Sequence, residues 1–201
     1  WAAQFPNMVK SILPFCASAK TSIHNHVFLE GVKAALIADQ NWNNGNYKSP
    51  PIAGLKAFGR VYAGWAFSQD FFREELYKKL GFQTEEELLK DWENDHVKNW
   101  DANNLLAKIN TWQTADISSG SVYNNDFKKA LKSINARTIL MPCNQDLYFR
   151  TEDNEFEAKY IKNAFLRPID SSFGHCAANP GNDKNFELQL DKNISELLNN
   201  P

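Results

Sequence analysis

The chain has 201 residues and a net charge of −2, with acidic and basic side chains mixed along its length. This length allows one sizeable core, with or without an inserted subdomain. No basic stripe indicates nucleic-acid binding, and the longest apolar runs are far shorter than a membrane span. The three cysteines, Cys16, Cys143 and Cys176, are sparse and odd in number. Such a set argues against a disulfide framework and favours a reducing, cytoplasmic environment.

The first 120 residues are predicted to be one strand followed almost entirely by helices. Residues 1–5 resemble the last turn of a helix stopped by Pro6, and residues 9–16 form the strand. The helical segment spans 21–119, and its predicted helices are 23–39, 52–68, 71–80, 84–92 and 102–115. It contains five tryptophans, which either line an acyl pocket or only pack the helices together.

The remaining chain is predicted to contain a strand–helix–strand unit. Its strands are 138–143 and 165–170, its helix is 152–163, and helices at 126–134 and 186–198 flank it. Asp146 follows the first of these strands and His175 follows the second. Parallel strands joined by a helix bring both loops to one edge of the sheet, where a carboxylate can orient an imidazole. Taken singly, each residue is more typical of a turn or loop.

The order acid then histidine matches the end of a nucleophile–acid–histidine triad, but this chain offers no nucleophile. It contains no Gly-x-Ser-x-Gly pattern, and the serines of 118–121 do not follow a strand. Cys16 and Cys143 end apolar runs and are expected to be buried. Cys176 is adjacent to His175 and should point away from it. No cysteine–histidine cluster has zinc spacing.

Three strands are too few for a sheet buried on both faces. We therefore expect further strands upstream of Trp1. We also expect a serine elbow within about 15 residues upstream, because a helix of typical length would separate the elbow from Trp1. On its own, the chain is expected to be inactive.

Several motifs resemble, in order, the homoserine O-acetyltransferase-like branch of the α/β-hydrolase superfamily. The matching segments are 37–47, 51–55, 101–104, 139–149 and 172–175. The resemblance implies the C-terminal part of an α/β-hydrolase fold, with a core of 1–20 and 120–201 and a helical lid of 21–119 between sheet strands. It also implies that Asp146 and His175 are catalytic and that the nucleophile is an upstream serine.

Two positions depart from homoserine acyltransferases. Those enzymes carry an aspartate after the histidine, where this chain has Cys176. They also carry an arginine after the lid Gly-Leu, at the place of Gly59, one residue before Arg60. The resemblance thus implies acyl transfer but leaves homoserine as the acceptor in doubt.

The sequence therefore predicts an enzyme that hydrolyses an ester through a Ser-Asp-His triad. Two alternatives stay open: an acyl-CoA-dependent O-acyltransferase acting on homoserine or another alcohol, and a non-catalytic fragment or binding module. The predicted partners are a small-molecule ester or alcohol, without nucleic acid or membrane, and a homodimer is one candidate assembly. No cofactor or metal is expected, although an acyl-CoA would be the co-substrate of a transferase.

Overall fold

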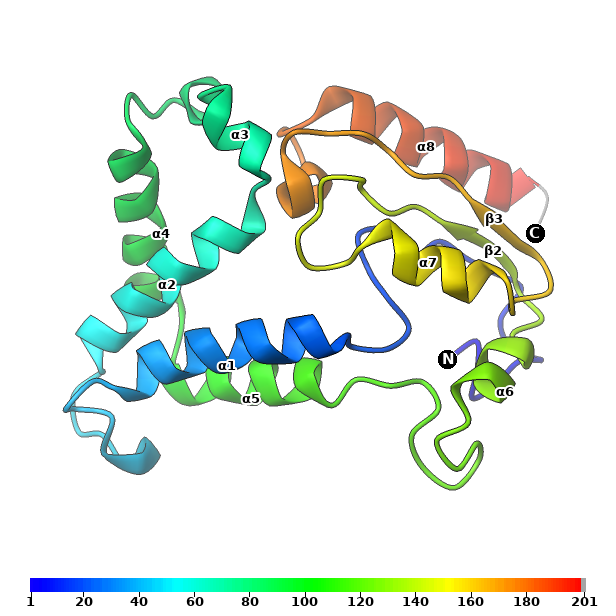
Figure 1. Ribbon diagram of the computed structural model, residues 1–201, viewed down its shortest axis with the longest axis horizontal. Coiled ribbons are helices and arrows are strands. Elements are labelled where there is room, and N and C mark those ends of the chain that lie inside the picture. Colours follow the sequence, from blue (N-terminus) through cyan, green and yellow to red (C-terminus); the bar gives the residue numbers. More distant parts are fainter. Residues whose placement is uncertain (200–201) are drawn as a thin grey trace. The chain divides into compact units, whose positions relative to one another are not determined.

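The computed structural model describes residues 1–199, which form two compact units. One unit consists of Trp1–Lys20 together with the chain from Asp116 onward, and it contains the sheet. The other, Thr21–Ala115, is helical (Figure 1). None of the described helices is both long and apolar enough to cross a membrane.

The sheet has three parallel strands in the order β1-β2-β3. They are β1 (Ser11–Ile12), β2 (Arg137–Leu140) and β3 (Ala164–Leu166). Each is shorter than predicted because a proline follows it: Pro14, Pro142 and Pro168. Proline cannot donate a hydrogen bond to the ladder, although its carbonyl can still accept one.

Strand pairing nevertheless continues beyond these prolines. The amide of Met141 donates to the carbonyl of Pro14, and the amide of Ile169 donates to that of Pro142, at 2.9 and 2.8 Å. Isolated bridges join Phe15 to Met141 and Cys143 to Ile169. The chain therefore remains in register at the carboxyl edge of the sheet, where the loops begin.

Helices pack on both sides of these strands. Figure 1 shows β2 and β3 running between α7 (Thr151–Ala158) and α8 (Lys184–Asn199). Glu196 of α8 forms ion pairs with Arg137 and Arg167 of the sheet region, which hold the helix in place. The short helix α6 (Phe127–Lys132) contributes to a core cluster consisting of Ala2, Ala3, Tyr123, Ala130, Leu131, Ile134, Ala136 and Ile161.

The helical unit contains four long helices: α1 (Ile23–Ile37), α2 (Ile52–Ala66), α4 (Glu85–Asn99) and α5 (Ala102–Gln113). Side chains of Ser22, Thr84 and Asp101 cap α1, α4 and α5 by accepting backbone amides of the first turn. Shorter elements are η1 (Asn43–Gly45), α3 (Gln69–Arg73) and η2 (Leu76–Leu80).

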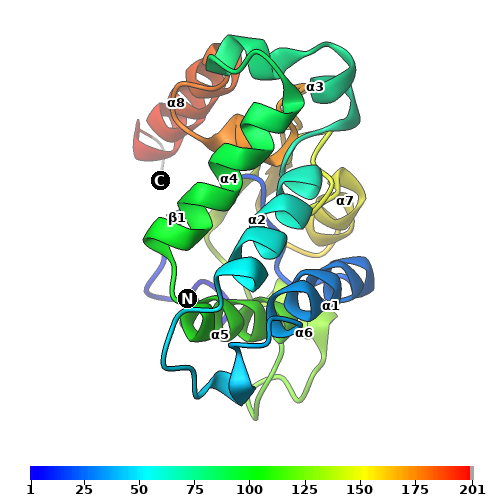
Figure 2. The ribbon, with the colours of Figure 1, turned by 90° about the vertical axis from the view of Figure 1, so that its left-hand side faces the viewer.

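The helix α2 packs against α1 and α4, and α1 packs against α5 (Figure 2). Two glycines of α2 make these contacts close. A Cβ atom on Gly54 would lie 2.3 Å from the carbonyl oxygen of Leu36, and one on Gly59 would lie 2.7 Å from that of Trp92. The third glycine, Gly64, has no neighbour within 4 Å and plays no such part.

Besides the strands, three predicted helical segments end or break earlier in the structure. The helix predicted at 71–80 is two short elements, because Glu75 adopts a left-handed conformation with φ of 53° between them. Residues 1–5 form turns with a single helical hydrogen bond, from the amide of Phe5 to the carbonyl of Trp1. The helix predicted at 152–163 ends at Ala158, and the chain then turns toward β3.

Candidate active site

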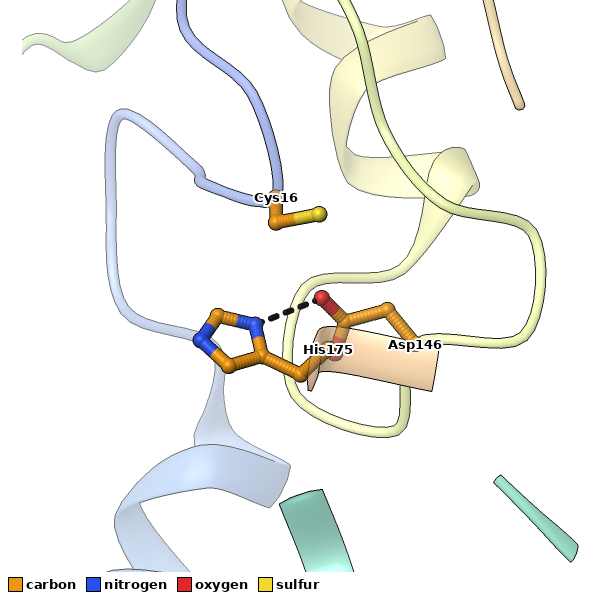
Figure 3. A group of neighbouring side chains, drawn as sticks. All are labelled: Cys16, Asp146 and His175. Carbon is orange, nitrogen blue, oxygen red and sulfur yellow. Dashed lines mark hydrogen bonds and ion pairs between the residues drawn. The ribbon is translucent and has the colours of Figure 1, made fainter. Parts of the chain in front are cut away.

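The structure brings Asp146 and His175 together at the carboxyl edge of the sheet. His175 Nδ1 lies 2.8 Å from Asp146 Oδ2 (Figure 3). The Asp146 side chain is fully buried, whereas the His175 side chain is 32% exposed. A buried carboxylate facing Nδ1 favours the tautomer that carries its proton there, which leaves the Nε2 lone pair available.

Backbone amides fix the orientation of Asp146. Its Oδ1 accepts hydrogen bonds from the amides of Tyr148 and Phe149, at 2.7 and 3.2 Å. Its own amide donates to the carbonyl of Cys143 at the end of the strand, at 3.0 Å. This is the local turn that an aspartate after a strand favours. The turn uses one carboxylate oxygen and directs the other toward the imidazole.

His175 lies in a short 3₁₀ helix, η3 (Gly174–Ala178), which the sequence did not predict. Two hydrogen bonds to Ser171 fix the start of this helix. Its carbonyl accepts one from the amide of Gly174, and its hydroxyl accepts one from the amide of Phe173. The rings of Tyr148 and Phe149 lie 4.7 and 5.6 Å from the imidazole, centre to centre. These aromatic contacts restrict the ring while Nε2 points away from Asp146 (Figure 3).

Cys16 is a third neighbour that the sequence reasoning treated only as a buried apolar residue. Its sulfur, a carboxylate oxygen of Asp146 and a ring nitrogen of His175 all lie within 4.8 Å of one another. Cys16 follows the first strand of the same sheet and has a left-handed φ of 44°. The predicted topology could have placed Cys16 near this pair, because parallel strands end at the same edge of a sheet.

None of the three cysteines fits a nucleophile for this histidine. All are buried. Burial, with Asp146 nearby, raises the pKa of Cys176 to about 12, and burial raises that of Cys143 to about 11. The Cys16 thiol has its pKa raised by the same burial and by Asp146, and Figure 3 shows it on the Asp146 side of the ring rather than at Nε2. A reactive thiol needs the opposite environment.

The helical unit, for whose tryptophans the sequence left open an acyl pocket or simple packing, contains a cavity of about 530 Å³. Trp100 and Trp112 are among its lining residues. Trp65 and Trp92 pack on Phe28 and Tyr62, and Trp42 packs on Tyr47. Two of the five tryptophans thus border a cavity, and the other three contact neighbouring rings.

Arg60 is engaged by two glutamates of the same unit. Its Nη1 and Nη2 each lie 2.9 Å from a carboxylate oxygen of Glu86, and its Nε lies 2.5 Å from Glu93. The neighbouring Gly59 has no room for a side chain beside Trp92. The arginine expected in homoserine acyltransferases therefore has no free counterpart at either position.

Comparison with known proteins identifies similar sequences, although no protein-family model matches. The chain is 32% identical to an ethyl acetate hydrolase of Pseudomonas veronii over 203 residues, covering 100% of this chain and 57% of that protein. It is 30% identical to a probable esterase of Corynebacterium glutamicum, covering 98% and 56%. It is 29% identical to a homoserine O-acetyltransferase of Chloroherpeton thalassium, covering 87% and 47%. The chain thus spans about half the length of these relatives.

Solved structures show the same relationship. The acetyl esterase MekB superimposes with a TM-score of 0.93 at 32% identity, over 99% of this chain and 57% of that one. A homoserine O-acetyltransferase from Bacillus anthracis superimposes with a TM-score of 0.82 at 25% identity, over 99% and 56%. These matches confirm the predicted fold class, a partial α/β-hydrolase fold.

Proposed function

Because the chain belongs to the α/β-hydrolase branch that contains these esterases and homoserine O-acetyltransferases, we propose that it supplies the acid and base of an ester-hydrolysing enzyme. The observation that carries the proposal is the 2.8 Å contact between Asp146 Oδ2 and His175 Nδ1. The nucleophile is a serine in the upstream part of the full-length protein.

In the proposed reaction, His175 acts first as a base and then as an acid. Nε2 removes the proton of the serine hydroxyl as the oxygen attacks the ester carbonyl, and it returns that proton to the departing alcohol. A water molecule then loses a proton to Nε2 as it attacks the acyl-serine, and Nε2 gives this proton to the serine oxygen as the carboxylic acid is released. Asp146 holds the ring and stabilises the imidazolium formed in each half-reaction.

The ion pairs of Arg60 support water rather than homoserine as the acyl acceptor. A homoserine acceptor carries a carboxylate, which the resemblance implies is held by a lid arginine at the place of Gly59, one residue before Arg60. Here Arg60 is neutralised by Glu86 and Glu93. Sequence identity is also slightly higher to the two esterases, at 30–32%, than to the Chloroherpeton acetyltransferase, at 29%.

The acetyltransferase relatives support a second candidate, acyl transfer from an acyl-CoA to an alcohol other than homoserine. It uses the same acyl-serine and differs only in the group that accepts the acyl chain. A non-catalytic binding module is the third candidate, and it requires no titratable pair at this edge.

Two assays on the full-length protein separate the three candidates. One measures acetate release from ethyl acetate, and the other measures acetyl transfer from acetyl-CoA to homoserine and simple alcohols. Hydrolysis is the expected activity, and His175→Ala should abolish it. The matched control is His24→Ala, which removes a histidine of α1. Transfer without acetate release would favour the second candidate. If His175→Ala retains both activities, the catalytic assignment of His175 is refuted.

A further inference from the structure

Three potential metal ligands of different types meet at the sheet edge: the Cys16 thiol, the Asp146 carboxylate and the His175 imidazole. One ligand atom from each lies within 4.8 Å of the other two, and Figure 3 shows the sulfur beside the hydrogen-bonded pair. Within residues 1–199, no second group of three such side chains meets this condition. Zinc binds this combination of sulfur, nitrogen and carboxylate oxygen. We propose that Cys16, Asp146 and His175 form a Zn²⁺ site whose occupation inactivates the histidine.

The three ligands need only small movements to bind zinc. In a tetrahedral site with Zn–N and Zn–O near 2.0 Å and Zn–S near 2.3 Å, ligand atoms lie about 3.3–3.6 Å apart. The Nδ1 to Oδ2 distance of 2.8 Å must therefore open by about half an ångström. Cys16 and Asp146 are buried on backbone that the sheet holds in register. His175, one-third exposed, can move and admit the ion, and a water molecule can complete the site.

Zinc binding at this site releases one proton. Near neutral pH the thiol of the metal-free protein carries a proton, since the ordinary pKa of a cysteine is about 8.5. Zinc binds the thiolate, so Cys16 loses its proton to solvent. A neutral imidazole that binds through Nδ1 keeps one proton, now on Nε2, so His175 releases none. Zinc affinity should therefore rise with pH.

The proton on Nε2 of zinc-bound His175 explains the proposed inactivation. This inactivation rests on the function proposed above. With zinc on Nδ1 and a proton on Nε2, His175 has no lone pair to accept the proton of a serine. Asp146, engaged by the metal, no longer stabilises an imidazolium. Zinc would therefore stop catalysis without occupying the position of the nucleophile.

Calorimetry with ZnCl₂ on the full-length protein tests the site directly. Two buffers of different ionisation enthalpy report affinity and proton release together. We expect one zinc ion and one released proton per chain. Cys16→Ser should weaken binding by more than about 100-fold, because changes even outside the ligand set cost 10–100-fold. The matched control is Cys143→Ser, whose buried sulfur contacts the carbonyl of Ser171 rather than the pair. Equal zinc affinity in wild type and Cys16→Ser would overturn the proposal.

A spectroscopic measurement on the wild type guards against a variant that fails to fold. CoCl₂ should bind at the same site and give thiolate-to-metal charge-transfer absorption. A cobalt-loaded protein without that absorption would refute the participation of Cys16.

An activity measurement separates this inference from the proposed function. Ester hydrolysis should fall in parallel with zinc occupancy, each variant being compared with its own rate without zinc. Zinc binding that leaves hydrolysis unchanged would overturn the inactivation. Absence of hydrolysis before zinc is added would count against the proposed function, while calorimetry would still decide whether the site binds zinc.

Discussion

Glu157 accepts a hydrogen bond from the backbone amide of Ala19, with 2.7 Å between Oε1 and the nitrogen. This contact ties α7 to the segment that follows Cys16. Asn154 reinforces it by donating to the carbonyl of Ala17 and to the second carboxylate oxygen of Glu157, each at 2.9 Å. The backbone beside the candidate active site is therefore held by a buried acid.

This acid should make stability depend on pH. Burial raises the pKa of Glu157 from 4.5 to about 7, despite the opposing hydrogen bonds from Ala19 and Asn154. Because its folded-state pKa is the higher one, the protonated form favours folding. Stability should therefore fall between about pH 4.5 and 7, by about 3 kcal/mol at most. Denaturant unfolding at several pH values should show this slope diminished in Glu157→Gln. The exposed Glu155→Gln is the control, and an unchanged slope in Glu157→Gln would contradict the assignment.

Replacing the acid of the candidate pair should reduce turnover and leave the fold intact. An asparagine at position 146 can still accept the amides of Tyr148 and Phe149, but it cannot stabilise an imidazolium. We expect Asp146→Asn to lower kcat for ester hydrolysis by about 10³–10⁴-fold with little change in KM. The control, Asp170→Asn, alters an exposed acid that follows β3 rather than β2. It should leave kcat nearly unchanged. A comparable loss in both variants would argue against a specific role for Asp146.

The cysteines should be unreactive in the native protein. With pKa values of about 11 and 12, Cys143 and Cys176 are less than about one-thousandth thiolate at pH 7.5. Burial also shields all three thiols. Iodoacetamide labelling followed by mass spectrometry should modify them only after denaturation. Rapid labelling of Cys16 in the folded protein would contradict its buried, protonated state.

Arg60 should contribute to packing of the helical unit rather than to substrate binding. Its ion pairs with Glu86 and Glu93 are partly exposed, and such pairs contribute about 0–1 kcal/mol. Arg60→Ala should therefore lower stability slightly and leave kcat/KM for ethyl acetate unchanged. A selective rise in KM for substrates that carry a carboxylate would instead indicate a binding role and favour the transferase.

The close crossing of α1 and α2 should make Gly54 intolerant of a side chain. Its added Cβ would lie 2.3 Å from the backbone oxygen of Leu36, which cannot move independently of α1. Gly54→Ala should destabilise the protein by about 1–3 kcal/mol, as overpacking does. Gly64→Ala, on the same helix but without a neighbour within 4 Å, should be neutral or stabilising by up to about 1 kcal/mol. Equal melting temperatures for the two variants would disprove this packing argument.

Short-range patterns were sufficient to locate most elements of secondary structure. Apolar periodicity and capping residues such as Thr84 and Asp101 mark helix starts within a residue or two, because they act through neighbours in the sequence. The placement of Asp146 and His175 after successive strands was likewise readable, since parallel pairing brings both strand ends to one edge.

Other features depend on groups that are distant in sequence. The left-handed break at Glu75 runs against the helical periodicity of residues 71–80. The position of Cys16 beside Asp146 required β1 and β2 to pair across more than 100 residues. Likewise, Gly59 shows why Arg60 could not be assigned from spacing alone: the room for a side chain there depends on the backbone of Trp92 on another helix. Burial, and with it the raised pKa values of Glu157 and the cysteines, exists only after these distant segments pack together.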